Sequence, residues 1–143
     1  MTVLDANILI YAADADAPQH ERIARWLADL FRGPELIAFT WPVVWAFVRV
    51  STDRRIQSRP RTVEDALSRV RDWLSEPGVK LVDAGPQHLA ILEELVTRCD
   101  ASGPLVSDAV LAALAIEHGA TLASTDRDFS RFPNLRWVNP LDV

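Results

Sequence analysis

The sequence contains a single cysteine and only five glycines, and both shortages exclude kinds of site. Cys99 alone rules out an internal disulfide and a zinc site built from cysteines. The glycines form neither a Gly-x-Gly-x-x-Gly turn nor a Gly-Lys-Ser/Thr loop, so the usual nucleotide-binding motifs are missing. No serine or cysteine nucleophile has a credible histidine partner, so we expect no covalent catalysis of that kind.

Long hydrophobic runs are also missing. No apolar run reaches the ~18 residues that a membrane span needs, and the N-terminus lacks the basic and apolar regions of a secretion signal. We therefore expect a cytoplasmic protein with no membrane partner. The chain does have 143 residues with 49% hydrophobic content, which is enough for one core and too short for two. The sequence predicts a single domain, residues 1–143.

Short apolar runs alternate with helical patterns along the whole chain. Segment 41–50 is apolar at almost every position, so we expect this helix to be buried on more than one side. The order predicts an α/β fold, a single three-layer α/β/α domain with a central, mainly parallel sheet of four to five strands. The expected strands are 2–4, 36–39, 79–82, 121–124 and 135–138, and the expected helices are 6–13, 18–32, 41–50, 63–74, 86–98 and one beginning at Ser107 or Asp108.

Carboxylates stand at the ends of three apolar segments. Asp5 follows the first strand, Asp108 lies at the expected start of the last helix, and Asp126 and Asp128 follow the fourth strand. The carboxyl ends of parallel strands are where such sheets bind ligands. Clustered carboxylates repel one another, so several at one crevice indicate a bound cation. Oxygen ligands favour Mg²⁺ or Mn²⁺ over zinc, and such a site suits hydrolysis of a phosphodiester.

Some of these polar residues have alternative structural roles. Asp5 and Asp128 are also suited to cap a helix N-terminus, where a carboxylate accepts hydrogen bonds from backbone N–H groups. The Thr125 hydroxyl is placed to orient a water or a phosphate, or to serve in a turn at the end of a strand. The sequence leaves these alternatives open.

Arginines gather between residues 49 and 61. The segment contains Arg49, Arg54, Arg55, Arg59 and Arg61 against Asp53 alone, within a chain of net charge −5. A planar guanidinium binds a phosphate or a carboxylate through two parallel hydrogen bonds. The segment is therefore a candidate surface for an RNA backbone or for an acidic partner peptide. A solvated, arginine-rich loop explains it equally well.

Three segments together resemble a PIN domain of the VapC type, the toxin of a bacterial toxin-antitoxin pair, and the likeness spans nearly the whole chain. They are Leu-Asp-Ala-Asn-Ile-Leu-Ile-Tyr at 4–11, Ser-Asp-Ala-Val-Leu-Ala-Ala-Leu-Ala at 107–115 with Glu-His-Gly-Ala-Thr-Leu at 117–122, and Ser-Thr-Asp-Arg-Asp-Phe at 124–129 followed by Leu-Arg-Trp-Val-Asn-Pro at 135–140. The resemblance implies a PIN-like fold and an endoribonuclease that depends on Mg²⁺ or Mn²⁺. It further implies an RNA substrate, a cognate VapB-type antitoxin that blocks the activity, and a homodimer.

By position, the resemblance makes Asp5, Asp108 and Asp126 the principal metal ligands and catalytic residues, with Asp128 as a further acid. Many relatives carry a glutamate where this chain has Ala46. The chain therefore uses fewer acids and a single metal ion, compensates through a neighbour such as Asp128, is a weak enzyme, or is a modified or inactivated copy. Arg49, Arg54, Arg55 and Thr125 are the candidates for binding the substrate.

Two other functions remain compatible with these residues. A Mg²⁺-dependent hydrolase of a small phosphoester would share the acids but would not need the arginines. A non-catalytic RNA- or protein-binding PIN-like module would account for Ala46.

Overall fold

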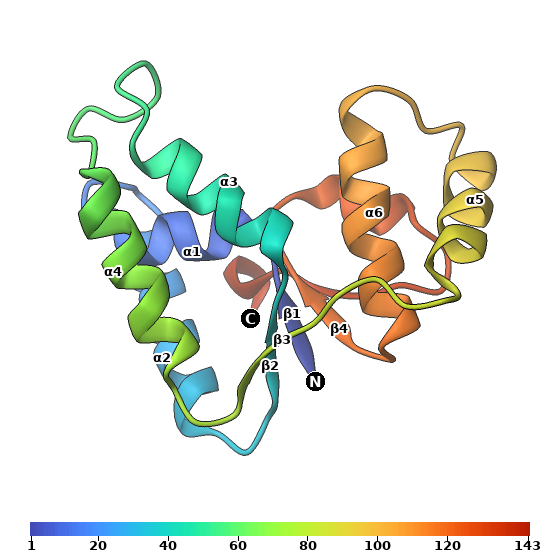
Figure 1. The fold of residues 1–143 in the computed structure, drawn as a ribbon, viewed down its shortest axis with the longest axis horizontal. Coiled ribbons are helices and arrows are strands. Elements are labelled where there is room, and N and C mark those ends of the chain that lie inside the picture. Colours follow the sequence, from blue (N-terminus) through green and yellow to red (C-terminus); the bar gives the residue numbers. More distant parts are fainter.

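All five strands of the protein lie in one sheet. The computed structural model describes residues 1–143 (Figure 1), with β1 at Thr2–Leu4, β2 at Ile37–Phe39, β3 at Val79–Leu81, β4 at Thr121–Ala123 and β5 at Arg136–Val138. The strand order is β3-β2-β1-β4-β5, and every neighbouring pair is parallel. The predicted α/β class is confirmed, and the sheet is parallel throughout.

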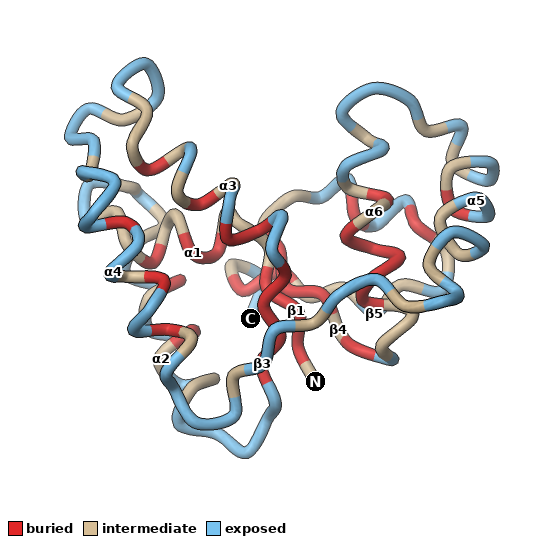
Figure 2. The backbone as a smooth tube through the Cα atoms, in the orientation of Figure 1, coloured by how far each residue is buried: buried red, intermediate tan, exposed pale blue.

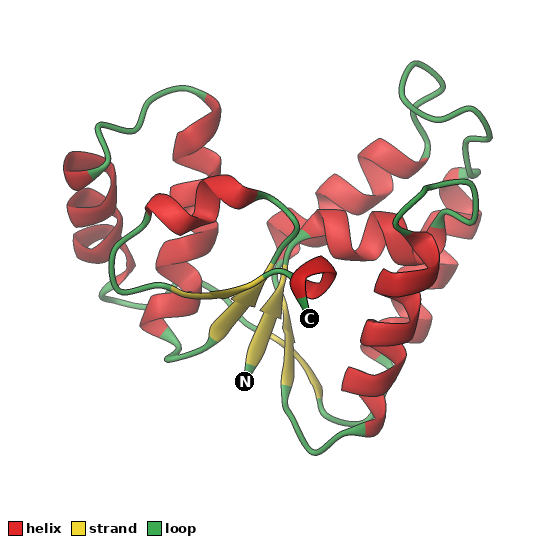
Figure 3. Ribbon diagram, turned by 180° about the vertical axis from the view of Figure 1, so that it is seen from behind, coloured by secondary structure: helices red, strands yellow, loops and turns green.

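Helices cover both faces of this sheet, as Figures 1 and 3 show from opposite sides. Helices α1–α4 lie on one face, and α5 and α6 lie on the other. This division follows from right-handed crossovers, because the chain moves outward from β1 to β3 and then returns past β1 to β4. The helices are α1 (Ala6–Ala13), α2 (His20–Arg32), α3 (Trp41–Ser51), α4 (Val63–Leu74), α5 (His88–Arg98) and α6 (Pro104–Glu117), with short 3-10 helices η1 (Arg127–Arg131) and η2 (Pro140–Asp142).

The core lies between the central strands and the helices on either side. Strands β1 and β2 are buried along their whole length, whereas β3 at the sheet edge is largely exposed. Figure 2 shows this gradient, with buried backbone in the central strands and exposed backbone in the outer loops. No helix has both the length and the apolar character needed to cross a membrane.

Helix α3 differs from its expected burial. The Thr40 side chain caps it by accepting a hydrogen bond from the Val43 backbone N–H, and Pro42 lies in its first turn. Phe47 is fully buried, but Trp41 and Trp45 are 42% and 65% exposed. The expectation of burial on more than one side was wrong, because the two tryptophans stack on each other at the surface instead of packing into the core.

Burial predicts how two aromatic positions of α3 contribute to stability. The Phe47 ring meets the Trp73 ring nearly edge-on, with 4.9 Å between centroids. Truncating a buried aromatic side chain costs ~3–5 kcal/mol, so we expect Phe47→Ala to lower the free energy of unfolding by that amount. Urea denaturation followed by circular dichroism measures it. Trp45→Ala is the matched control on the same helix, with an expected loss below ~1 kcal/mol. Equal losses would contradict this packing.

Candidate active site

The candidate site lies where the direction of the strand order reverses. Strand β1 pairs with β2 on one side and with β4 on the other, and Leu4 lies opposite Ala123. The residues that follow these two strands, Asp5 and Ser124, therefore leave the sheet side by side. The backbone N–H of Asp5 donates to the Ala123 carbonyl at 3.0 Å. Open parallel sheets bind ligands at such a reversal point, beyond the carboxyl ends of the strands.

Both oxygens of Asp5 accept hydrogen bonds. Oδ1 accepts from the Ala6 backbone N–H at 2.7 Å, so Asp5 does cap α1. Oδ2 accepts from Ser124 Oγ at 2.6 Å and from Asn7 Nδ2 at 2.9 Å. Burial raises the pKa of Asp5 above its ordinary value, although the hydrogen bonds from Ser124 and Ala6 oppose this rise and the nearby charge of Asp126 adds to it. Capping therefore fixes the orientation of this carboxylate without removing it from the site.

Asn7 and Ser124 complete a polar network that the sequence analysis did not assign. Ser124 is fully buried, and its Oγ accepts hydrogen bonds from Asn7 Nδ2 and from the Asp126 backbone N–H, both at 3.0 Å. Asn7 Oδ1 accepts from the Thr125 backbone N–H at 3.2 Å. The positions of the asparagine and the serine, two residues from Asp5 and from Asp126 respectively, are a signal visible in the sequence, but the pattern of strand ends indicates only the carboxylates as metal ligands. The network joins the ends of β1 and β4.

Asp108 lies inside helix α6, because the helix begins earlier than expected. It starts at Pro104 instead of at Ser107 or Asp108. Proline suits the first helical turn, since its missing N–H would have no partner there. The helix is preceded by Gly103, whose φ of 59° favours glycine. Asp108 is therefore not a capping residue, and its carboxylate lies in the second turn.

Three carboxylates converge at this point. Asp108, Asp126 and Asp128 each place an oxygen within 4.8 Å of the other two. Burial, together with the charges of Asp126, Asp5 and Asp128, raises the pKa of Asp108 to about 6. Like charges held this close disfavour ionisation unless a cation compensates. Because the donors are all carboxylate oxygens, the set fits Mg²⁺ or Mn²⁺.

The structure corrects one detail of the acidic loop. Asp126 caps η1, because its Oδ1 accepts a hydrogen bond from the Asp128 backbone N–H at 2.9 Å. The cap had been considered for Asp128, which instead lies exposed in the first turn of η1. The Asp128 carboxylate is therefore not used as a cap.

Ala46 faces the same site. It lines a cavity of 150 Å³ together with Asp5 and Asp108, and Val43 and Leu111 provide apolar walls. A carboxylate at position 46 would thus stand beside the two acids. The missing glutamate leaves an apolar recess at this place.

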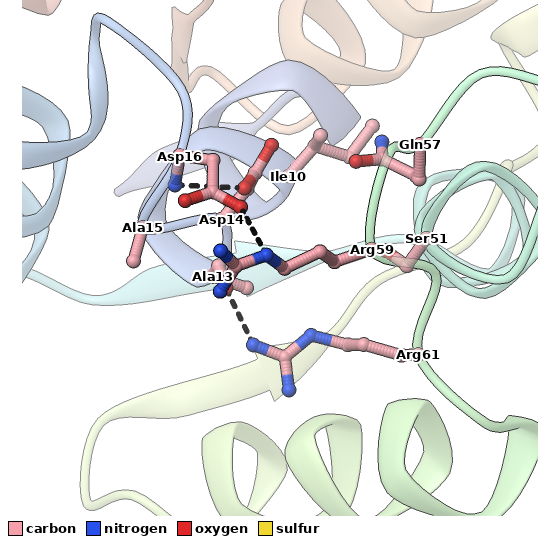
Figure 4. Close-up of a pocket in the computed structure, with 9 residues that line it drawn as sticks. All are labelled: Ile10, Ala13, Asp14, Ala15, Asp16, Ser51, Gln57, Arg59 and Arg61. Atoms are coloured by element: carbon pink, nitrogen blue, oxygen red, sulfur yellow. Dashed lines mark hydrogen bonds and ion pairs between the residues drawn. The ribbon is translucent and has the colours of Figure 1, made fainter.

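The arginine cluster does not converge on the acids. Arg59 pairs with Asp16 at 3.5 Å, and Arg61 pairs with Asp65 and donates to the Ala13 carbonyl. Figure 4 shows Arg59 and Arg61 reaching from the 52–62 loop to the segment after α1, around a separate cavity of 210 Å³. These two arginines therefore hold the loop against α1 and α4.

The remaining three arginines are exposed. Arg55 pairs with Asp53 at 3.3 Å, and no ion pair engages Arg49 or Arg54. None of the three lines the cavity that Asp5 and Asp108 share. Thr125 contributes its backbone N–H to the network, which fits the turn role considered for it. The four acids are thus brought together, and the candidate substrate-binding arginines lie apart from them.

The chain matches a known protein family over nearly its whole length. The family model for the PIN domain matches residues 2–135. Ribonuclease VapC33 of Mycobacterium tuberculosis is 40% identical over 141 residues, which cover 99% of each chain. The chain therefore belongs to the PIN-domain family, and within it to the VapC ribonuclease group.

Two further comparisons agree. Ribonuclease VapC37 of Mycobacterium tuberculosis is 39% identical over 140 residues, 98% of this chain and 97% of the relative. The structure of VapBC2 from Rickettsia felis bound to a promoter DNA fragment is similar, with a TM-score of 0.73, 23% identity, and coverage of 96% of this chain and 97% of that one. At this identity the structural likeness supports the fold alone.

The raised pKa of Asp108 predicts how stability depends on pH. Its pKa is about 6 in the folded protein against an ordinary value of 3.8, so between these values the folded state binds more protons than the unfolded state. Asp108 therefore destabilises the fold increasingly as the pH rises from about 4 to about 6. We expect Asp108→Asn, in EDTA, to melt at a higher temperature than wild type at pH 7.5 and at a similar temperature below pH 4.

Thermal denaturation at a series of pH values measures this difference, and Glu93→Gln, an exposed acid on α5, is the control with no expected pH-dependent gain. Added Mg²⁺ should raise the melting temperature of wild type more than that of Asp108→Asn, because a bound ion stabilises the folded state. A lower melting temperature for Asp108→Asn at pH 7.5 in EDTA would contradict the described repulsion.

Proposed function

We propose that this chain is the toxin of a toxin-antitoxin pair, an endoribonuclease that hydrolyses RNA phosphodiester bonds with Mg²⁺ or Mn²⁺. The observation that carries the proposal is the convergence of Asp108, Asp126 and Asp128 at the strand reversal point, on a chain that belongs to the VapC ribonuclease group. We further propose that residues 1–143 act as a single nuclease domain in the cytoplasm, where cellular RNA is available.

The carboxylates have distinct roles in this proposal. Asp108, Asp126 and Asp128 would hold the cation, since their oxygens already lie within 4.8 Å of one another. The chemistry that Mg²⁺ or Mn²⁺ would supply there is activation of a water and stabilisation of charge on the phosphoryl oxygens. Asp5 would complete the ligand set from the end of the neighbouring parallel strand β1. Because Ser124, Asn7 and Ala6 hold its two oxygens, Asp5 needs no reorientation when the substrate binds.

Groups around the acids position the substrate. Thr125 immediately precedes Asp126, which caps η1, and its hydroxyl is our candidate for orienting a water or a phosphate oxygen. Arg49, Arg54 and Arg55 would contact RNA at some distance from the scissile bond, because they do not line the acidic site. Their part is electrostatic attraction of the RNA backbone.

One observation favours a second function. Ala46 lines the site and offers no carboxylate, so a non-catalytic RNA-binding module keeps the same geometry without turnover. The ribonuclease proposal is preferred because the three converging acids remain, and because the relatives that match over nearly the whole chain are named ribonucleases.

The decisive test is cleavage of total cellular RNA by the purified protein. We expect discrete fragments with Mg²⁺ or Mn²⁺, none with EDTA, and a loss of at least ~100-fold in rate for Asp108→Ala, since a lost metal ligand removes the activated water. Glu93→Gln should cleave as wild type does. Metal-independent RNA binding without fragments would favour the non-catalytic module, and cleavage of a small phosphoester in place of RNA would favour the other hydrolase.

We also propose a VapB-type antitoxin as the partner, and a homodimer as the assembly. A groove of 630 Å³ runs between α3 and α4, and its lining is mainly apolar, including Trp45, Leu67 and Leu74. An exposed apolar groove with charged residues at its edge is typical of a protein interaction site. Arg49 and Arg71 also line the groove, so they suit carboxylates on the partner. Arg49 is therefore placed to contact either partner, whereas Arg54 and Arg55 lie outside the groove and suit RNA alone.

Trp45 should be central to antitoxin binding, because half-exposed tryptophans in apolar grooves are typical hot spots. We expect Trp45→Ala to weaken binding of the antitoxin encoded beside the toxin by at least ~10-fold, which is ~1.4 kcal/mol. Isothermal titration calorimetry measures the dissociation constant. Leu89→Ala is the matched control, because Leu89 is equally exposed at 67% but lies on α5, across the sheet. Equal weakening by both variants would contradict the assigned groove.

A further inference from the structure

The cavity beside Ala46 has a form that the metal chemistry does not require. Its floor is made by Val43, Leu111 and Leu114, which are 4%, 7% and 4% exposed. Its rim includes the exposed residues Pro42 and Ser107. A recess with an apolar floor and an open rim is suited to part of a ligand that reaches in from solvent.

We propose that this recess binds the base of the nucleotide next to the scissile phosphate, and that it selects pyrimidines. The proposal rests on the proposed ribonuclease function and deepens it. Asp108 both lines the recess and belongs to the converging carboxylates. A phosphate held at those carboxylates through a cation therefore has the recess within reach of its own nucleotide, because only one sugar separates a phosphate from its base.

Chemistry excludes the other parts of a nucleotide. A phosphate inside the recess would lie against the apolar floor, and no arginine, lysine or histidine in the lining would compensate its charge. A ribose would bury several hydroxyl groups, and apart from Asp5 and Asp108, which are committed to the metal site, Ser107 is the only polar side chain in the lining. Buried hydroxyls without partners are costly. A base presents apolar faces to Val43 and Leu111 and needs few hydrogen bonds at its edge, one of which the Ser107 hydroxyl is placed to make.

Size separates the two kinds of base. The cavity measures 150 Å³, and an apolar cavity of about 150 Å³ in another protein accommodates one benzene ring. A pyrimidine has a single six-membered ring, whereas a purine has two fused rings. Ala46 sets this size, because any larger side chain at that position would project into the recess.

The test maps cut sites in a mixed-sequence RNA for wild type, Ala46→Leu and Ala46→Val with Mg²⁺ or Mn²⁺. Wild type is expected to cut next to pyrimidines at least ~10-fold faster than next to purines, a difference of ~1.4 kcal/mol in activation free energy. Ala46→Leu should reduce this ratio to near one, and Ala46→Val should reduce it in part. Ala90→Leu, which adds the same side chain at an exposed position of α5, should keep the wild-type ratio.

A second measurement does not depend on turnover. Cytidine and adenosine are added separately to the metal-free protein, and the methyl signals of Val43, Leu111 and Leu114 are followed by NMR. Cytidine should shift these signals in wild type, less in Ala46→Val and not in Ala46→Leu, and adenosine should shift them little in any of the three. Thermal melting followed by circular dichroism shows which variants fold. If Ala46→Leu does not fold, Ala46→Val takes its place in both measurements.

The outcomes separate the two proposals. The base recess is overturned if wild type cuts RNA without a base preference, or if Ala46→Leu and Ala46→Val cut with the same preference for pyrimidines as wild type. In both cases the ribonuclease proposal is supported. If no RNA is cut under any metal, the ribonuclease proposal fails. Cytidine shifts would then support a base site in a non-catalytic RNA-binding module, and their absence would overturn the recess as well.

Discussion

The hydrogen bond from Ser124 Oγ to Asp5 Oδ2 is the contact around which the site is organised. It joins residues 119 positions apart in the sequence, and it forms because β1 and β4 are neighbours in the sheet. Asn7 and the Asp126 backbone N–H bind the same serine oxygen. One buried hydroxyl thus fixes Asp5, and it also positions the loop that carries Asp126 and Asp128.

Electrostatic repulsion is the second constraint on this site. The sheet and α6 bring four carboxylates together, and the cost is visible in the raised pKa values of Asp5 and Asp108. No arginine relieves it, because the arginine-rich loop is occupied elsewhere. Arg59 and Arg61 hold that loop against neighbouring helices. A divalent cation bound among the carboxylates would compensate their negative charge. Ala46 limits the repulsion, because it adds no further carboxylate to the site.

Apolar surface is unevenly distributed over helix α3. Val43 and Phe47 enter the core, while Trp41 and Trp45 stay at the surface beside the groove formed with α4. A helix that is apolar on all sides must bury its second face against something. In the isolated chain nothing covers it, which is consistent with a partner protein at this face. The same helix therefore borders the acidic site through Ala46 and the proposed partner surface through Trp45.

The sequence alone determined the class of fold and the acidic residues that form the candidate site. Alternating apolar runs and capping signals were enough to predict the strands and helices, because burial and local backbone preference act over short distances. The ends of the strands also revealed Asp5 and Asp126. Only the tertiary structure decided that Asn7 and Ser124 tie the strand ends together, and that the arginines lie apart from the acids. These features depend on which distant segments become neighbours, and a linear pattern does not encode those distances.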